Sequence, residues 1–268
     1  MYFITFSRKM GTGGSEIAQR VADRLGYKFH DTDAIENMAR EMGFLDDVRK
    51  VDDKPPSFFM RFFSQKPDAH ADRLNAVIYE LASRGSAVFL GRGSHILLRS
   101  FECALHVRVT ASLEHRIENL VNRGIPRSEA AKLIQRSDYE RSGFIKLFFG
   151  VDWDNPELYD LTLNMDYISV NLAVDTVAQI AKSEEARTCS IDAIKSLEMM
   201  GLAQRAEAAL IEAGLLQVPS VSVAQPGRVQ LTGIVSDQKT RERIEEILKG
   251  VRGVQSVDNK ILVVTARS

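Results

Sequence analysis

The stretch that decides the fold is ITFSRKMGTGGSEIAQRVADRLGYKFHDTDAI, residues 4–35. A short apolar run leads into a glycine-rich turn. Apolar residues at three- and four-residue spacing follow, and then a second apolar run. This pattern predicts a strand, a turn, a helix and a strand, which is the order of elements around a phosphate-binding loop. In such a loop, consecutive backbone amides and the helix N-terminus face the phosphate oxygens.

The glycine-rich turn departs from the usual phosphate-loop pattern GxxxxGK[ST] at two positions. When Gly13, Gly14 and Ser15 are set on the last three positions, the second glycine and the serine are kept. Gly14 then stands where the lysine belongs, and Arg8 stands where the first glycine belongs. The Ser15 hydroxyl remains in place to hold a magnesium ion. The simpler alternative is that the glycines only make a tight turn from strand to helix.

Two cations of the same loop are candidates to replace the missing lysine. Arg8 would offer a bidentate fork and Lys9 a point charge, while the alternative is that both are solvated. The dinucleotide-binding pattern GxGxxG does not fit, because Glu16 stands at its third glycine. An acidic residue there would repel a pyrophosphate. The loop is therefore interpreted as a phosphate site with relocated positive charge.

Four more strand-like runs follow the same scheme, namely YKFHD, AVFLGRG, ALHVRVTA and YDLTLNM. Helical stretches lie between several of them, which predicts a parallel, doubly wound sheet. Ligands of such sheets bind beyond the carboxyl ends of the strands. The polar residues at these ends, which we expect to face a site, are Ser7, Asp31, Gly91, Arg92 and Asn164.

Composition breaks near KSEEARTCS, residues 182–190. A helical stretch follows, then two alternating strands around a Pro-Gly turn, an amphipathic helix and a last strand. The sequence therefore predicts two domains, residues 1–183 and 190–268. Between the predicted strands of the first domain, residues 46–73 carry paired prolines and the aromatic patch SFFMRFF. This segment is either a helical excursion with its own small core or a mobile cap over the site.

Bulk properties narrow the function classes. The net charge of −1 argues against a nucleic-acid binder. Cys103 and Cys189 lie far apart in the chain, form no metal-binding pattern, and suit a reducing compartment. The first residues do not show the basic region and apolar stretch typical of a targeting segment, and the sequence contains no run of about 18 apolar residues, so we expect neither feature. A soluble cytoplasmic protein is the prediction.

The first domain resembles the cytidylate-kinase-like family of P-loop nucleotide kinases, in its branch without the GK pair. The resemblance rests on SRKMGTGGSEIA, DDKPPSFF, GRG, a D..R pair and DWDNPELYDLTLN, which occur here in order. It implies an α/β fold with a P-loop kinase-type parallel sheet flanked by helices. It also implies transfer of the γ-phosphoryl group of ATP, with Mg²⁺, to a nucleoside monophosphate or similar acceptor. A non-catalytic nucleotide-binding protein is the alternative, and a scaffold that binds no nucleotide is a third interpretation.

The resemblance also assigns roles to residues. The phosphate cradle would be Gly11, Thr12, Gly13, Gly14 and Ser15. Arg92 would grip the acceptor phosphate, Asp138 would also bind the substrate, and Arg116 would begin a lid and bind the nucleotide. Arg136 and Arg141 would close over the transferred group, with Asp138 between them. If the resemblance is set aside, the same residues are interpreted as ordinary ion pairs on a helix surface. Asp31 would bind a ribose hydroxyl or a magnesium-bound water.

Some positions depart from better-known cytidylate kinases. Gly93 replaces an acidic residue used in acceptor recognition, and Glu36 and Asn37 replace a tyrosine and an arginine. The acceptor base is therefore left open. The only tryptophan, Trp153, either contacts nucleotide or covers the sheet edge, and we favour the second.

Residues 190–266 resemble a BON domain, a small αββαβ module. The resemblance rests on GRVQLTGIVSD, QKTRERIEEILKG and VRGVQSVDNKILVV. It implies binding to phospholipid surfaces or to other proteins. Acidic residues are interspersed among the basic ones of the amphipathic helix, so a protein contact or a dimerising sheet edge is favoured over lipid. Homo-oligomer formation is left open.

Overall fold

In a computed structural model of the chain, the described residues are 3–50, 67–183, 188–215 and 219–264. They form two compact units. The first contains residues 3–37, 84–183 and 188–190, and the second contains residues 38–50, 67–83, 191–215 and 219–264. Within these ranges no helix is long and apolar enough to cross a membrane. The predicted domain boundaries at residues 183 and 190 stay a prediction.

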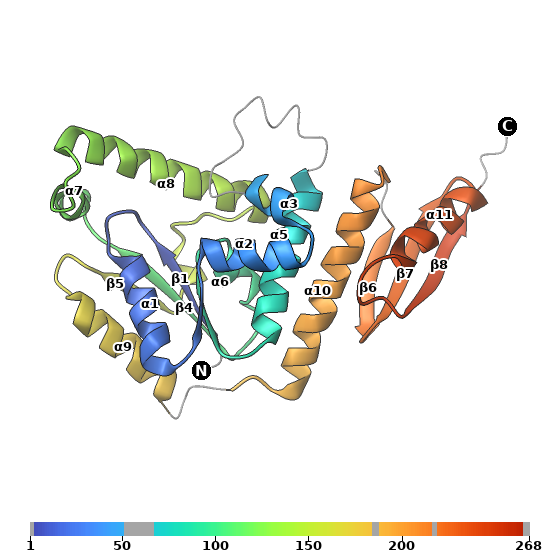
Figure 1. Cartoon of the computed structure of the whole chain (residues 1–268), viewed down its shortest axis with the longest axis horizontal. Coiled ribbons are helices and arrows are strands. Elements are labelled where there is room, and N and C mark those ends of the chain that lie inside the picture. The colour runs from blue at the N-terminus through green and yellow to red at the C-terminus, as the bar shows by residue number, and fades with distance from the viewer. Residues whose placement is uncertain (1–2, 51–66, 184–187, 216–218, 265–268) are drawn as a thin grey trace. The chain divides into compact units, whose positions relative to one another are not determined.

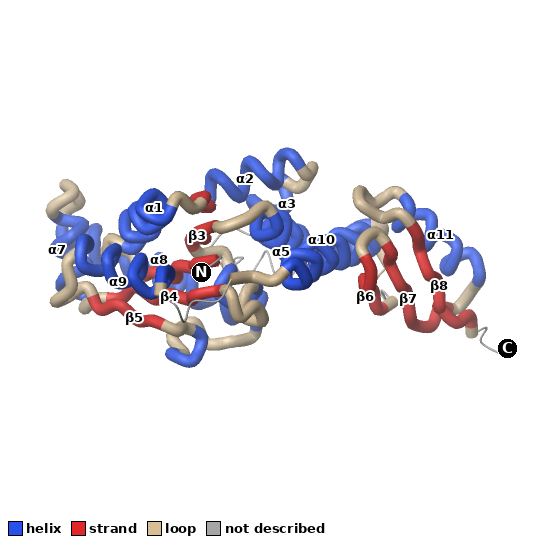
Figure 2. Tube along the Cα trace, turned by 90° about the horizontal axis from the view of Figure 1, so that it is seen from below, coloured by secondary structure: helices blue, strands red, loops and turns tan. Residues whose placement is uncertain are grey.

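The first unit is built on a parallel sheet of five strands (Figures 1 and 2). The strands are β1 (Phe3–Arg8), β2 (Lys28–His30), β3 (Ala87–Leu90), β4 (Ala104–Thr110) and β5 (Leu161–Asn164), in the order β2-β3-β1-β4-β5. All five predicted strands are confirmed. Because β1 is central, with Phe6 opposite Leu90 and Arg8 opposite Val109, the glycine-rich loop leaves the middle of the sheet.

Helices connect the strands of the first unit. They are α1 (Gly14–Leu25), α6 (Ser94–Leu97), α7 (Leu113–Val121), α8 (Arg127–Phe149), the 3₁₀ helix η1 (Pro156–Leu158) and α9 (Val170–Lys182). The helix α2 (Thr32–Glu41) follows β2. The apolar faces of α1 and α9 pack together on one face of the sheet, with Ile17, Val21 and Val177 fully buried. Figure 1 shows these two helices side by side. The predicted α/β class, with a parallel sheet flanked by helices, is thereby confirmed.

The second unit contains a smaller mixed sheet in the order β6-β7-β8 (Figure 2). Its elements are α10 (Ile191–Glu212), β6 (Ser220–Gln225), β7 (Arg228–Val235), α11 (Gln238–Lys249) and β8 (Ser256–Val263). β6 pairs antiparallel with β7, whereas β8 pairs parallel to it. The core includes Leu210 of α10, Leu231 of β7 and Ile244 of α11. The predicted order of helix, two strands, helix and strand is confirmed.

Two earlier segments also belong to the second unit, namely α3 (Leu45–Lys50) and α5 (Pro67–Ser83). α5 packs along α10. The buried Arg73 of α5 bonds to Asp47 of α3 and to Glu212 of α10, and its guanidinium lies 4.9 Å from the centre of the Phe44 ring. Residues 51–66, which include the SFFMRFF patch, lie outside the described residues. The choice between cap and separate core therefore stays open.

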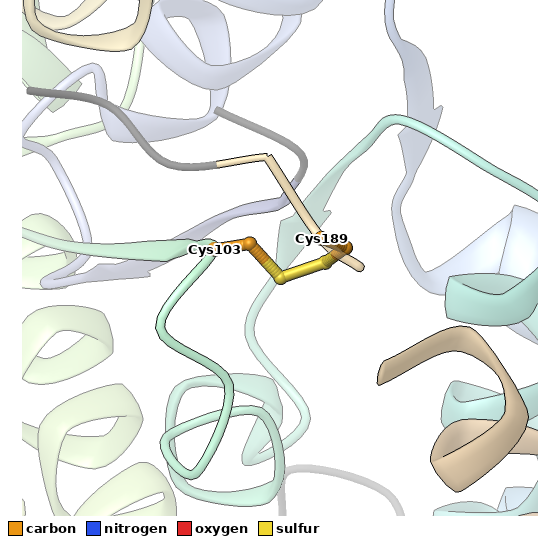
Figure 3. Close-up of a disulfide and its surroundings, with 2 residues drawn as sticks. All are labelled: Cys103 and Cys189. Atoms are coloured by element: carbon orange, nitrogen blue, oxygen red, sulfur yellow. A yellow bond between two sulfur atoms is a disulfide. The ribbon is translucent and has the colours of Figure 1, made fainter. Parts of the chain in front are cut away.

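A disulfide joins Cys103, just before β4, to Cys189, in the segment after α9 (Figure 3). Their Cα atoms lie 5.0 Å apart, although 86 positions separate them in sequence. The disulfide weighs against the prediction that the two cysteines suit a reducing compartment, because cytosolic thiols are held reduced. The pairing was not predicted, because distance along the chain says nothing about the distance in space between the start of β4 and the segment after α9.

Reduction of this disulfide should destabilise the protein, because a long loop is then released in the unfolded chain. We expect the free energy of unfolding to fall by about 2–4 kcal/mol. Urea unfolding with and without dithiothreitol measures this difference. The variant with both Cys103→Ser and Cys189→Ser should match the reduced protein and show no response to dithiothreitol. An equal midpoint for the oxidised and reduced wild type would contradict the prediction.

Candidate functional site

The glycine-rich loop begins where β1 ends and closes on itself through Thr12. The buried Thr12 hydroxyl donates to the Lys9 carbonyl at 2.8 Å and accepts from the Gly14 amide at 3.3 Å. Gly11 and Gly13 have φ of 82° and 76°, a region that favours glycine. α1 then starts at Gly14, and the amides of its first turn lack intrahelical partners by geometry. The predicted cradle is therefore folded as a turn that presents amides.

α7 holds the outer side of this loop. The Arg116 Nε donates to the Met10 carbonyl at 2.7 Å, and the Asn119 Nδ2 donates to the Gly11 carbonyl at 2.8 Å. A peptide plane points its carbonyl and its amide in opposite directions. The amides that follow Met10 and Gly11 are therefore turned away from α7. A Cβ on Gly11 would lie 2.6 Å from the Arg116 carbonyl oxygen, so only glycine fits this close approach.

Arg116 and Asp138 form a bidentate ion pair between α7 and α8. Both guanidinium nitrogens lie 2.8 Å from the carboxylate oxygens, and Arg116 is only 4% exposed. Arg116 was expected to bind nucleotide, and Asp138 was expected to bind substrate. Both roles stay predictions. What the structure shows is that the pair ties α8 to the helix that grips the loop.

The position of the absent lysine is filled by the side chain of Arg8. A Cβ on Gly14 would lie 2.6 Å from the Arg8 Cβ and 3.2 Å from the Val109 Cβ. Carbon atoms that are not bonded to each other prefer separations of about 3.5–4.0 Å. The two departures from the usual motif are therefore coupled. Glycine replaces the lysine at position 14, and arginine, whose side chain takes up the space, replaces the glycine at position 8.

Three arginines converge on a cavity of about 20 Å³ beyond the ends of β1 and β3. They are Arg8, Arg92 and Arg141, and the apolar part of the wall includes Phe144, Ile145 and Trp153. The Arg141 Nη1 also donates to the Arg8 carbonyl at 3.0 Å. Residues from β1, the β3 loop and α8 thus bring concentrated positive charge to one place. This is an environment suited to an anion.

Arg92 has an unusual backbone. Its φ is 57°, and it is the one non-glycine residue with positive φ in the described part of the chain, while its side chain is 2% exposed. Gly91 and Gly93 on either side also have positive φ. A Cβ on Gly93 would lie 2.3 Å from the Phe149 ring of α8. Close packing of α8 thus explains why glycine, and not an acidic residue, follows Arg92.

The other predicted site residues lie elsewhere or have local partners. The side chain of Arg136 is 69% exposed and pairs with Glu140 at 2.8 Å, outside the cavity wall. The Asp31 Oδ1 accepts from the Ala34 amide at 3.0 Å at the start of α2. Ser15 is exposed in the first turn of α1. The roles of these residues stay predictions.

Sequence reasoning missed a buried cluster around Arg108 of β4. Its Nη1 donates to the Tyr159 hydroxyl at 2.8 Å and to the Trp153 carbonyl at 2.9 Å, and its guanidinium lies 3.9 Å from the centre of the Trp153 ring. The Trp153 Nε1 donates to the Ser7 Oγ at 2.8 Å. Trp153 therefore covers the carboxyl end of the central strand β1, and the choice between a nucleotide contact and a cover of the sheet edge stays a prediction. An arginine inside the apolar run ALHVRVTA was the available signal.

Two buried histidines lie beside this cluster. Burial, with a smaller effect from His106 and nearby arginines, lowers the pKa of His95 to about 3. Burial also lowers the pKa of His106 to about 4, although Asp160 opposes the shift. The His95 ring stacks on Tyr159 with 5.1 Å between ring centres, and the His106 Nδ1 lies 2.8 Å from the Thr5 hydroxyl oxygen. Both histidines are neutral in the folded protein at pH 7.

Acidification should destabilise the protein through these histidines. Their pKa values lie near 6.5 when unfolded and lower when folded, so the unfolded chain takes up more protons as the pH falls below 6.5. We expect each histidine to remove about 1–2 kcal/mol of stability between pH 7 and pH 5. Urea unfolding across this range measures the slope. His95→Gln should flatten the slope, whatever its effect at pH 7, and an unchanged slope would contradict this prediction.

The exchange between positions 8 and 14 can be tested by stability. Gly14→Ala should lower the free energy of unfolding by about 1–3 kcal/mol, because the added methyl collides with the Arg8 side chain. Arg8→Gly in the same chain should recover most of the loss. Gly201→Ala, also in a helix but with 3.5 Å to the nearest atom, is the matched control and should be tolerated. Equal losses from Gly14→Ala with and without Arg8 would disprove the exchange.

One similar solved structure agrees with this architecture, and two others are less similar. An uncharacterised protein of Eubacterium ventriosum superposes with a TM-score of 0.54 at 19% identity, over 66% of this chain and 96% of that one. Shikimate kinase of Bacteroides thetaiotaomicron gives 0.42 at 12% identity, over 68% and 100%. Shikimate kinase of Acinetobacter baumannii, in complex with shikimate, gives 0.40 at 16% identity, over 70% and 96%. No curated protein matches the sequence.

Two family models match the sequence, in the order that the folds suggest. Residues 201–265 match the BON domain, which corresponds to most of α10 and all of the small sheet with α11. Residues 3–167 match the cytidylate kinase-like family, and they include the glycine-rich loop, the arginine cavity and the Arg108 cluster. The chain belongs to the cytidylate kinase-like family and carries a C-terminal BON domain.

Proposed function

We propose that this protein is a phosphotransferase that moves the γ-phosphoryl group of Mg-ATP to a nucleoside monophosphate or a similar acceptor. The observation that carries the proposal is the convergence of Arg8, Arg92 and Arg141 on one cavity beyond the ends of β1 and β3. Phosphoryl transfer depends on positioning and on neutralising charge spread over the phosphate oxygens. Three guanidinium groups at the end of the central strands supply that charge.

The loop fits the nucleotide phosphates. The carbonyls of Met10 and Gly11 are held by Arg116 and Asn119, so the amides that follow them are turned away from α7. In this proposal they face the ligand together with the amides that follow Gly14 at the start of α1. Gly11 and Gly13 permit the turn, and Ser15 would hold Mg²⁺ through its hydroxyl. Within the described ranges no group of three or more His, Cys, Asp or Glu side chains gathers to hold a metal by itself. In this proposal the ion arrives with the nucleotide, whose phosphate oxygens complete its coordination.

The cavity has the volume of about one or two water molecules, which is smaller than a phosphate group needs. Phe144 and Ile145 of α8 form part of its wall. In this proposal α8 moves outward to admit the acceptor and returns with Arg141. Arg92 binds the acceptor phosphate, and Arg8 supplies the charge that the usual loop lysine would supply. Asp31 remains a candidate contact to the acceptor ribose.

The proposal also concerns the cellular location of the protein and the partner of its BON domain. A cytoplasmic location stays a prediction, and the Cys103–Cys189 disulfide weighs against it because cytosolic thiols are held reduced. For the BON domain we propose a protein contact rather than a lipid surface, since the exposed side of α11 mixes Glu242 and Glu246 with Arg243 and Lys249. Nucleic acid is not expected as a partner.

The direct test is ADP release from Mg-ATP with the full chain, screened against CMP, dCMP, UMP, AMP and GMP. Acceptor-dependent release that is lost in Arg92→Ala would support the kinase and name its acceptor class. ATP binding without turnover for any acceptor would favour the non-catalytic nucleotide-binding alternative. Absence of ATP binding would overturn both.

Two arginines of α8, Arg136 and Arg141, provide a matched pair of variants. Arg141→Ala should lower kcat by about 10²-fold or more and change KM little, as expected for a group that acts on the transition state. Arg136→Ala removes the same charge from the same helix at an exposed position. If Arg136 closes over the transferred group as the family resemblance implies, its variant loses kcat as well. If it acts only as a surface ion pair, activity is kept, and equal retention in both variants would contradict the role of Arg141.

A further inference from the structure

Lys9 leaves the end of β1 and reaches the loop that follows α8. Its Nζ lies 3.2 Å from the Asp154 Oδ1, and the Lys9 side chain is 23% exposed. Asp154 belongs to DWDNPELYD and lies two positions before the start of η1. Its carboxylate also binds the Nη2 of Arg108. The Asp154 carboxylate thus binds both Lys9 of the loop and Arg108 of β4.

Arg108 is the fixed end of this chain of contacts. Its side chain is 5% exposed, lies against the Trp153 ring and bonds to the Tyr159 hydroxyl. Burial of a guanidinium is costly without a carboxylate partner. Asp154 is that partner, although its own side chain is 58% exposed. The buried arginine therefore holds the carboxylate at a defined position at the rim of the loop.

The charges of the three groups do not cancel. Two cations share one carboxylate, so Lys9, Asp154 and Arg108 together carry a formal charge of about +1. An ammonium has three donors, and a single carboxylate oxygen engages one of them. Asp154 therefore orients Lys9 without neutralising it fully. A lysine on a flexible stem loses side-chain entropy when it binds a ligand, and prior orientation reduces that loss.

We propose that Asp154 is a positioning residue, which holds the Lys9 ammonium beside the phosphate loop as a preoriented point charge for the nucleotide phosphates. Arg108 anchors Asp154, and Trp153 and Tyr159 anchor Arg108. The assignment rests on the proposed function, because it requires a polyphosphate ligand. It also gives Lys9 a role distinct from that of Arg8, which lies in the cavity with Arg92.

The direction in which one substitution changes the affinity for ATP separates this positioning role from an effect of net charge alone. Asp154→Asn removes a negative charge near the loop, and by charge alone it should tighten the binding of an anion. If Asp154 positions Lys9, the same substitution weakens binding. Glu157→Gln removes a negative charge from the exposed surface of η1, only three positions away, and reports the effect of charge by itself.

The experiment is calorimetric titration of the full chain with ATP, in the presence and absence of Mg²⁺. We expect Asp154→Asn to raise the Kd about 10-fold, Lys9→Met to raise it by a similar factor, and the double variant to add little further. Glu157→Gln should leave the Kd unchanged or slightly lower. Unchanged or tighter binding in Asp154→Asn overturns the proposal, as does a double variant whose loss is the sum of the two.

Two further variants test whether a loss of ATP binding is caused by misfolding. Lys9→Met leaves the pair of Asp154 and Arg108 intact, so its fold should persist, and urea unfolding checks this. Asp154→Glu keeps the charge but displaces the carboxylate by one methylene, so it should weaken ATP binding although the net charge is unchanged. A wild type that binds no ATP would refute the proposed function. A wild type that binds ATP with no dependence on Asp154 would refute the positioning role alone.

Discussion

The contact between Arg8 and Gly14 constrains the whole candidate site. A side chain at position 14 has no room, because the Arg8 Cβ and the Val109 Cβ occupy the space. The cation of the loop must therefore leave from the end of β1 and not from the first turn of α1. From β1 it enters the cavity where Arg92 and Arg141 also meet. The positive charge of the usual lysine is thus supplied from a different backbone position, at the end of β1.

Moving the charge to the strand changes what must hold the loop. α7 fixes the carbonyls of Met10 and Gly11, and the pair of Arg116 and Asp138 ties α7 to α8. α8 in turn brings Arg141 to the Arg8 carbonyl. The loop, α7 and α8 therefore form a closed set of contacts. A shift of α8 away from the sheet would alter the position of Arg141 and, through Asp138, the grip on the loop.

Sequence patterns predicted the structural features that are determined by residues close together in the chain. The five strands, the glycine turn and the helix after it follow from alternation, apolar spacing and glycine, so they were predictable. The placement of Ser7 and Arg92 at one cavity also followed, because parallel strands end at the same edge. The disulfide, the burial of Trp153 on Ser7 and the bond from Arg108 to Asp154 join residues that are 45 or more positions apart. No periodicity encodes such contacts.

The cluster around Arg108 shows why a charged residue can stand inside a buried strand. Stacked on Trp153 and bonded to Tyr159, Arg108 has few alternative positions, so its partner Asp154 is held as well. An apolar residue at position 108 would pack without this requirement, and buried ion pairs are often replaceable at no cost in stability. Stability alone therefore does not account for an arginine at this place. A fixed carboxylate next to Lys9 does, because orientation of a mobile cation requires a rigid partner.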